Sequence, residues 1–462
     1  MRRLLAIAGL TWKAAFRFRL FIVVAVLLLA AVVGLPILIK DDGTARGFTQ
    51  ILLTYTLSTI TALLGLSTLW LSCGTLARDI EECQMQMVAV KPIARWQIWL
   101  GKWLGIMSLN VALLAISGGS VYALLQWRST KLPAEEQRIL HNEIFVARGS
   151  AKEPTYEKEM EAEVDRRLKL VLAKNTVTAA DAKLLRQQLK EQLRAGAQVV
   201  QPRGPRLWQI NLGSAKNHLR GQPLFLRVKF NAAEKSPSGT FGALWQVGVP
   251  GKTKLWQTRE PMSLAPDTFH EFEIPADLFD ENGVLTVLFR NPNNTTLLFP
   301  LEDSMEVLYR EGGFGLNFVR GLGIILCWMA LLSALGLAAA SFLSFPVAAF
   351  ASLAVLLMSF STGTLSSAVE EGTIMGHDSE AGVTGHSPID IVVIPAFRVA
   401  LKLINFAKGF SPIDALSTGR SITWGELSAA FAQIVLVLGG IIALFGIVAF
   451  HRRELATAQN QS

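Results

Sequence analysis

The sequence predicts an α-helical polytopic membrane protein with six spans and an inserted extracytoplasmic region, helical at first and then β-sandwich-like. Two observations lead to this fold class. Hydrophobic residues make up 51% of the 462 residues and charged residues only 17%, a balance typical of membrane proteins. The apolar residues also gather into stretches of about 20, the length that a helix needs to cross the hydrocarbon core of a bilayer.

Six apolar stretches have this length, three toward each end of the chain. The first is too long for the apolar core of a cleaved signal peptide, and no small-residue cleavage site follows it. None of the six contains Asp, Glu, Lys, Arg or His, which disfavours a gradient-driven carrier, because such carriers place ionisable groups within the bilayer. The stretches are Leu20–Ile39, Ile51–Ser72, Trp103–Gln126, Gly321–Ser341, Phe345–Leu365 and Leu427–Phe450.

Basic residues set the expected orientation. Five cations and no acid precede the first stretch, and a basic run follows the last one (His451, Arg452 and Arg453). Lys and Arg concentrate on the cytoplasmic side of membrane proteins, and an even number of spans returns the chain to that side. We therefore expect both termini in the cytoplasm. The net charge of +8 then indicates contact with anionic headgroups rather than with nucleic acid. The five cations are Arg2, Arg3, Lys13, Arg17 and Arg19.

The predicted domains follow from changes in pattern. Residues 1–127 form one membrane half and 314–462 the other, with an outer-face loop at 366–426. Residues 128–206 show two amphipathic helical stripes, which predict a projecting helical hairpin or two helices packed on their own domain. Thr178–Asp181 is a plausible capping box for the second helix. The stripes are Met160, Val164, Leu168 and Val171, then Leu185, Leu189 and Leu193.

Residues 207–313 alternate apolar and polar residues in short runs separated by Pro, Gly and Asn, as in a β-sandwich. The clearest strands are Leu224–Phe230, Phe269–Ile274 and Leu285–Phe289. Three tryptophans of this region, Trp208, Trp245 and Trp256, either form a sugar-binding platform or pack in the core, and core packing is the favoured interpretation.

The outer-face loop contains an apolar segment interrupted by Arg398 and Lys402. Cations at mid-depth are costly in a span, so we expect Ala396–Lys408 to be an amphipathic helix at the outer interface. Irregular spacing makes a solvated loop the favoured interpretation for His377, Asp378, Glu380 and His386, so no metal or other cofactor is predicted. Apolar packing is likewise favoured for the three cysteines, Cys73, Cys83 and Cys327.

The segment between the second and third stretches carries the functional prediction. Three acids open a helical pattern at 78–90, where they suit the positive end of the helix dipole, and an apolar stripe follows at helical spacing. Lys91-Pro92 ends the helix, and Arg95 and Lys102 lead back into the membrane. The acids are Asp79, Glu81 and Glu82, and the stripe is Ile80, Cys83, Met87 and Val88.

This segment resembles the corresponding loop of ABC transporter permeases of the type-2 export class. The family pattern reads roughly R-(D/E)-x-E-x-G-T-x-E-x-L-L-x-x-P-x-(S/A)-R-x-x-x-x-x-G-K. The chain has Cys83, Gln84 and Gln86 in place of its Gly-Thr-x-Glu. The resemblance implies that 78–90 is a coupling helix that receives movement from a cytoplasmic ABC ATPase subunit, and that two permease subunits pair as a homodimer or heterodimer. An ordinary amphipathic connector is the alternative. The matching positions are Arg78, Asp79, Glu81, Pro92, Ala94, Arg95, Gly101 and Lys102.

Small and hydroxyl residues line one face of the second stretch at alternating spacings of four and three. Such faces allow close approach and hydrogen bonding between helices. We interpret this one as a dimer interface or translocation path, or equally as packing against a neighbouring span of the same subunit. The residues are Thr54, Ser58, Thr61, Gly65, Thr68 and Ser72.

A nucleotide-binding loop is not predicted. Gly248–Thr253 ends like a phosphate-binding loop, but position 246, where that motif needs glycine, is Gln246. Together with this absence, the resemblance implies the permease subunit of an ATP-driven exporter in a bacterial inner (cytoplasmic) membrane, with hydrolysis carried out by a partner. A membrane-anchored extracytoplasmic binding or scaffold protein is the alternative, and a gradient-driven carrier is less favoured.

Overall fold

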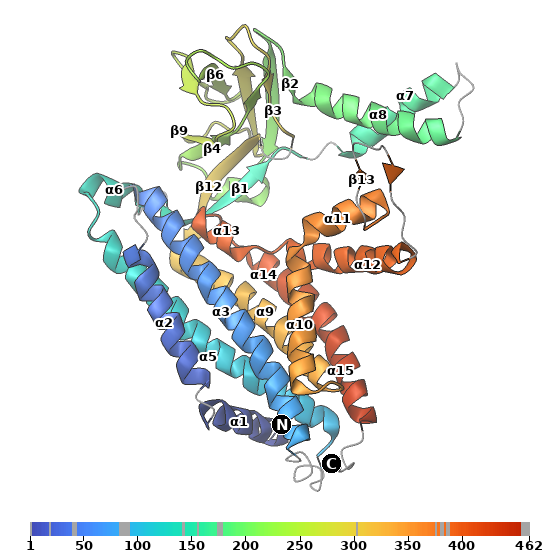
Figure 1. Ribbon diagram of the computed structural model, residues 1–462. Helices are drawn as coiled ribbons and strands as arrows, with labels where there is room; N and C mark the ends of the chain where they lie inside the picture. The colour runs from blue at the N-terminus through green and yellow to red at the C-terminus, as the bar shows by residue number, and fades with distance from the viewer. Residues whose placement is uncertain are drawn as a thin grey trace. The chain divides into compact units, whose positions relative to one another are not determined.

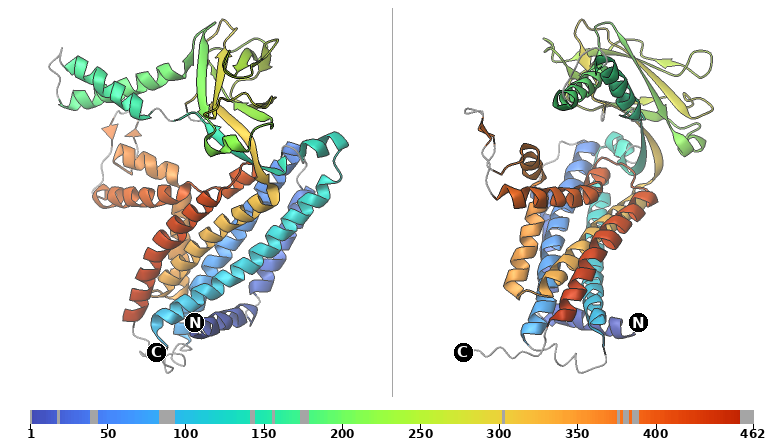
Figure 2. Two further views of the ribbon diagram at one scale, coloured as in Figure 1. Left: turned by 180° about the vertical axis from the view of Figure 1, so that it is seen from behind. Right: turned by 90° about the vertical axis from the view of Figure 1, so that its right-hand side faces the viewer.

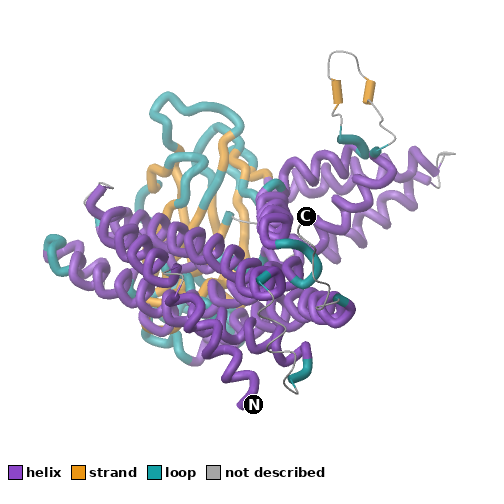
Figure 3. The backbone as a smooth tube through the Cα atoms, turned by 60° about the horizontal axis from the view of Figure 1, so that its bottom comes forward, coloured by secondary structure: helices purple, strands orange, loops and turns teal. Residues whose placement is uncertain are grey.

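The computed structural model describes residues 2–17, 20–38, 44–82, 93–140, 144–154, 157–172, 179–301, 304–374, 377–378, 383–384 and 389–453. The chain divides into two compact units. One combines Met1–Val146 with Gly313–Ser462, and the other is Ala147–Gly312. We call them the helical unit and the strand-rich unit after their main elements, and Figure 3 shows helices and strands in different colours. The predicted separation of a helical membrane part from a β region is confirmed.

The first half of the helical unit contains α1 (Arg2–Arg17), α2 (Leu20–Leu38), α3 (Ala45–Glu81), α5 (Arg95–Ser129) and α6 (Ala134–Ile139). The second half begins with α9 (Phe314–Ala340), which packs against both α3 and α5. Figure 1 shows α1 lying crosswise at the end of the bundle where α5 begins.

Within the described residues, four helices are long and apolar enough to cross a membrane: Thr49–Glu81, Arg95–Ser129, Phe314–Ala340 and Trp424–Arg452. The pair α10 (Phe345–Phe360) and α11 (Thr362–Glu371) would make a fifth, but its axis bends by 73° at the break. The span predicted over Phe345–Leu365 thus corresponds to this bent pair. The apolar helix Ile22–Leu35 of α2 is shorter than these. A multi-pass helical membrane part is therefore supported, and the count of six spans stays a prediction.

The region after α11 holds a short hairpin, β13 (His377–Asp378) with β14 (Val383–Thr384), and then α12 (Asp390–Lys408) and α13 (Pro412–Ser417). Figure 2 shows α11 and α12 lying across the direction of the long helices, and α12 encloses the amphipathic helix predicted at Ala396–Lys408. The last long helix joins α14 (Trp424–Ala430), a π-helical stretch η3 (Phe431–Gly439) and α15 (Gly440–Arg452).

The strand-rich unit is built from antiparallel strand pairs in three sheets. The largest has the order β3 (Pro205–Asn211), β10 (Val284–Arg290), β6 (Phe241–Val247) and β7 (Trp256–Gln257), with β8 (Met262–Leu264) also paired to β6. The second has the order β1 (Val146–Lys152), β12 (Met305–Gly313), β4 (Leu224–Val228) and β9 (His270–Ile274). The smallest has the order β2 (Val199–Val200), β11 (Leu297–Leu298) and β5 (Asn231–Ala232), and a 3-10 turn, η2 (Gly213–Asn217), follows β3.

Alternating side chains from the two larger sheets form one apolar core, as expected of a β-sandwich. Trp208 of β3 and Trp245 of β6 are almost fully buried in it, with ring centroids 6.1 Å apart. Trp256 is half-buried and stacks on Phe272. Core packing therefore accounts for Trp208 and Trp245, and the three predicted strands correspond to β4, β9 and β10.

Two helices project from the strand-rich unit as the predicted hairpin: α7 (Glu157–Leu172) and α8 (Ala179–Gln198). Ion pairs join them, from Arg186 to Asp165 at 3.2 Å and from Lys190 to Glu161 at 3.5 Å. The region predicted as helical, 128–206, differs in that β1 precedes α7 and β2 follows α8. Its first residues, up to Val146, belong to the helical unit. The β1 sequence VARGSAK lacks an apolar alternation that would reveal a strand.

Candidate functional site

The charged residues at the end of α3 continue that helix rather than start a new one. Arg78 to Glu81 form its last turn, and the Glu82 backbone N–H donates to the carbonyls of Arg78 and Ile80. Ile80 packs against the neighbouring apolar cluster. The start predicted for the coupling helix at 78 is therefore replaced by the end of α3. Cys83, Met87, Lys91 and Pro92 lie outside the described residues, so the rest of the helix predicted over 78–90 stays a prediction.

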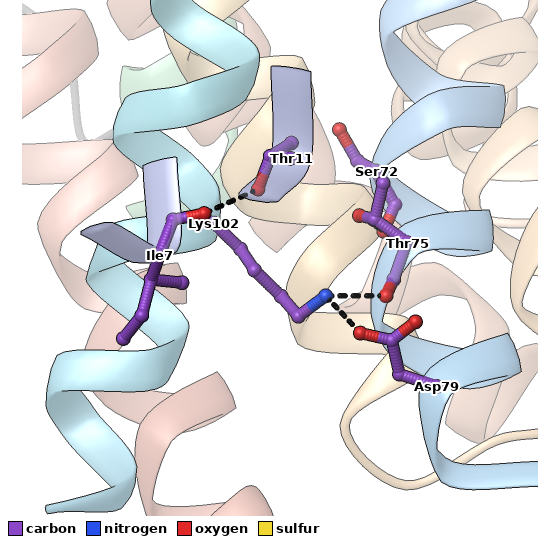
Figure 4. Close-up of polar contacts among 6 residues, drawn as sticks. All are labelled: Ile7, Thr11, Ser72, Thr75, Asp79 and Lys102. Atoms are coloured by element: carbon purple, nitrogen blue, oxygen red, sulfur yellow. Dashed lines mark hydrogen bonds and ion pairs between the residues drawn. The ribbon is translucent and has the colours of Figure 1, made fainter. Parts of the chain in front are cut away.

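Lys102 binds Asp79 across the interface between α5 and α3. Its ammonium nitrogen lies 2.5 Å from Asp79 Oδ2 and donates to the Thr75 carbonyl at 2.6 Å (Figure 4). The Lys102 side chain is 9% exposed and that of Asp79 is 35% exposed. A buried ammonium needs such partners, because leaving a charge without them in an apolar setting is costly. The pair thereby fixes the end of α3 on the start of α5.

Two glycines of α5 let α1 approach closely beside this ion pair. A Cβ at Gly101 would lie 2.7 Å from Ile7 Cβ, and one at Gly105 would lie 2.7 Å from Thr11 Cβ. The Thr11 hydroxyl turns back to its own helix and donates to the Ile7 carbonyl (Figure 4). The adjacent Gly101 and Lys102 therefore connect α5 to two different helices, α1 and α3.

Arg78 and Glu81 connect α3 to the start of α10. Glu81 Oε1 accepts the backbone N–H of Phe345 at 2.8 Å. The Arg78 guanidinium lies over the Phe345 ring, 4.3 Å from its centroid, a cation–π arrangement. A carboxylate at a helix N-terminus is favourable because the first N–H groups lack partners within the helix. Both side chains thus hold α10 at its first residue.

Arg95 connects α5 to the end of α15. Its Nη1 donates to the carbonyls of Phe450, His451 and Arg453 at 2.7–3.0 Å. Arg453 in turn donates to the carbonyls of Ala340 and Leu343 at the end of α9. Both arginines satisfy carbonyls that a helix C-terminus leaves unpaired. The predicted coupling residues and Lys102 therefore link α3, α5, α10 and α15, and Arg453 adds α9.

Figure 1 places all these contacts at one end of the bundle, the end at which the described chain stops at Glu82 and resumes at Ile93. The sequence pattern singled out Arg78, Asp79, Glu81, Arg95 and Lys102, but it did not indicate the contacts that they make. Thr75, Phe345 and Arg453 carry no motif, although Phe345 directly follows Ser344 and precedes Pro346, a combination typical of a helix start.

The hydroxyl face of α3 changes character along its length. Gly65, Thr68 and Ser72 are buried, whereas Thr54 and Thr61 are half-buried and Ser58 is exposed. A Cβ on Gly336 of α9 would lie 2.6 Å from Ser72 Cβ, and Thr68 donates to Asn110 Oδ1 of α5 at 3.0 Å. For its buried part, packing within the same subunit accounts for the face.

The structure also gives the positions of other candidates named from the sequence. Gly248–Thr253 forms the turn between β6 and β7 of an antiparallel pair, rather than the strand-to-helix loop that a phosphate site requires. Cys73 and Cys327 are buried among helices. Among the described residues, no group of three or more His, Cys, Asp or Glu side chains is arranged to hold a metal ion. Glu380 and His386 lie outside those residues.

Comparison of the chain with protein-family models, with curated proteins and with solved structures finds no match.

Proposed function

We propose that this chain is the permease subunit of an ATP-driven ABC exporter, which moves a substrate out across a bacterial cytoplasmic membrane together with a separate ATPase subunit. One observation supports this most directly. The segment 83–92 is bracketed by residues that contact four different long helices through Asp79, Glu81, Arg95 and Lys102. A displacement of that segment by a soluble partner would therefore be transmitted to the linked helices α3, α5, α10 and α15.

The mechanical argument rests on stiffness. Asp79 and Lys102 fix α3 to α5 with a short, largely buried ion pair, and Glu81 fixes α3 to α10. Packed helices with such end contacts move as bodies rather than bending locally. Closure of an ATPase beneath the segment would shift these helices together and alter the path between paired permease subunits.

The contact surface for the ATPase lies in the segment itself. Asp79 and Glu81 already bind groups of this chain, so a charge reversal at either would disturb the bundle as well as any docking. The apolar stripe of the predicted helix offers a cleaner test. On that helix Met87 lies on the stripe, whereas Met85 lies on the opposite side because it is two residues away.

The experiment compares Met87→Glu with the matched control Met85→Glu. Both variants and the wild type are co-expressed with an ATP-binding protein encoded beside this chain, and co-purification and ATP hydrolysis are measured in nanodiscs. We expect Met87→Glu to weaken association at least tenfold, since a buried hot-spot side chain commonly contributes that much. Met85→Glu should retain both readouts. Equal behaviour of the two variants, or no association in the wild type, would contradict the proposal.

The alternative, a membrane-anchored binding or scaffold protein, is favoured by the strand-rich unit, which has its own core. This function requires no ATPase. Failure of the wild type to co-purify with any ATPase, together with retention of cell-surface material by the full chain, would support it over the exporter.

A further inference from the structure

Helix α1 packs against the rest of the helical unit mainly along one side. Ile7, Ala8, Thr11 and Ala15 are buried, with Ile7 and Thr11 seated against the glycines of α5. The other positions from Arg2 to Phe16 are exposed or half-buried. A helix held along one side only leaves the others to meet whatever surrounds the bundle.

One exposed side is apolar. Leu5 and Phe16 are 67% and 43% exposed, and they align because they are eleven residues, about three turns, apart. Trp12 beside them contacts Phe16 and donates from Nε1 to Ser108 Oγ at 2.6 Å. Ser108 lies farther along α5 than Gly105, toward the middle of that span, so this side of α1 faces the same way.

The next side is cationic. Arg2 and Lys13 are also eleven residues apart, are both exposed, and lie nearly opposite the buried side. Among the described residues neither makes an ion pair. No acidic residue occurs in α1, whose sequence is RRLLAIAGLTWKAAFR. The positive charge is therefore uncompensated on the helix itself.

We propose that α1 is an interfacial helix that binds anionic phospholipid headgroups through Arg2 and Lys13 while Leu5 and Phe16 enter the adjoining acyl chains. The position of α1 supports phospholipid as its binding partner, because α1 lies crosswise at the end of the bundle. The apolar helix α2 begins directly after it. Cationic and apolar sides placed next to each other match the boundary between headgroups and hydrocarbon. This inference does not depend on the proposed transport function.

The close packing of α1 against α5 suits a role at the membrane surface. The glycine contacts leave no room for α1 to rotate about its axis, since any side chain larger than hydrogen at Gly101 or Gly105 would overlap α1. The cationic side, which lies nearly opposite the contact with α5, is thus held in one direction. Lipid charge would then act on the same end of α5 that binds α3.

The test uses the full-length protein in detergent and native mass spectrometry with equimolar dioleoyl-phosphatidylglycerol and dioleoyl-phosphatidylcholine. The wild type should retain the anionic lipid preferentially. Arg2→Gln/Lys13→Gln should lower that retention on the order of tenfold, because each cation near an anionic surface contributes to binding. The control Lys252→Gln/Arg259→Gln removes the same charge from exposed positions of the strand-rich unit and should behave as the wild type. Absence of a preference in the wild type, equal losses in both double variants, or unchanged retention in the first would overturn the proposal.

A second measurement stays decisive if the double variant folds poorly. Spin labels are placed singly by Leu5→Cys and Lys13→Cys in a Cys83→Ser background, with the protein in phosphatidylglycerol-containing nanodiscs. Cys73 and Cys327 are buried and remain unlabelled. The label at 5 should be relaxed mainly by oxygen and the label at 13 mainly by a water-soluble nickel chelate. Equal access of the nickel chelate to both labels would place α1 in solution and overturn the proposal.

Discussion

Lys102 is more deeply buried than its partner Asp79, although the two charges lie only 2.5 Å apart. Removing one partner of a buried ion pair costs about 3–5 kcal/mol when the other charge is left without solvent, and much less when water reaches it. Asp79→Ala strands the buried ammonium, whereas Lys102→Met leaves a carboxylate that is 35% exposed. We therefore expect Asp79→Ala to lower the thermal unfolding midpoint in detergent more than Lys102→Met does. Equal midpoints, or the reverse order, would show that the pair is effectively solvated.

The bond from Glu81 to Phe345 leads to a local prediction. Glu81→Gln keeps the size of the side chain but removes the charge that faces the start of α10, and a helix cap of this kind contributes roughly 1 kcal/mol. Hydrogen exchange measured by mass spectrometry should therefore speed up about fivefold in the first turn of α10, with little change in α9. Glu135→Gln, which removes one charge from an exposed position of α6, is the control and should leave α10 unchanged.

Close packing between α3 and α9 depends on Gly336. An added Cβ would lie 2.6 Å from Ser72 Cβ and 3.2 Å from the Leu69 carbonyl oxygen. Gly336→Ala should therefore destabilise the protein by about 1–3 kcal/mol, the usual cost of overpacking, and reduce the yield of monodisperse protein. At Gly119 of α5 a Cβ meets nothing within 4 Å, so Gly119→Ala should be neutral or stabilising. Similar yields for both variants would show that α3 and α9 can move apart to accommodate the added methyl group.

The predicted orientation places Cys83 in the cytoplasm and the strand-rich unit outside. Glu234 is exposed in that unit, so Glu234→Cys in intact cells should react with an impermeant thiol reagent. Cys83 should react only after the cells are permeabilised, and Cys73 and Cys327 are too buried to contribute. Labelling of Cys83 in intact cells, or protection of the cysteine at 234, is incompatible with this topology.

Asp277 gives the strand-rich unit a dependence on pH. The backbone N–H of Gly221 and the ammonium of Lys254 hold the pKa of its carboxyl below the usual value. Its contribution to stability is therefore complete above the unfolded-state pKa of about 3.9 and is lost as pH falls through the lower folded-state pKa. Asp277→Asn should unfold more readily than the wild type at neutral pH.

That difference should vanish at a pH of about 2. Asn also tolerates the positive φ of 62° at position 277, so the comparison isolates the charge. Fluorescence of the buried Trp208 and Trp245 reports unfolding of this unit. Glu260→Gln, at an exposed position, is the control, and a difference between Asp277→Asn and the wild type that is the same at both pH values would exclude the charge as its cause.

Patterns within single elements predicted the fold well where burial alone decides the structure. The long apolar stretches lie in α3, α5 and α9, and the alternating runs of the insertion form β4, β9 and β10. The break near Ser361 was missed because the apolar composition of Phe345–Leu365 continues past it. The Thr-Gly-Thr at 362–364 was the local signal, since Gly and β-branched residues weaken a helix.

Contacts between distant elements could not be predicted from spacing. Glu81 and Phe345 are 264 residues apart, and Arg95 and Arg453 are separated by 358. The sequence identified the charged residues of one loop as candidates. Nothing in it indicated that they bind a backbone N–H and several carbonyls at helix ends. Such partners carry no side-chain signature, because every residue except proline has both groups.

The π-helical stretch η3 affects how residues of the last long helix are compared. Each bond in such a stretch encloses one residue more than an α-helical bond, so side chains beyond Gly439 are turned around the axis relative to those before Phe431. In a mutational scan across Trp424–Arg452, positions should therefore be assigned to helix faces separately before and after η3. If Trp424–Arg452 is instead counted as one uninterrupted α-helix, lipid-facing and packed positions are assigned to the same face. Substitutions at the two kinds of position then appear to have the same average effect.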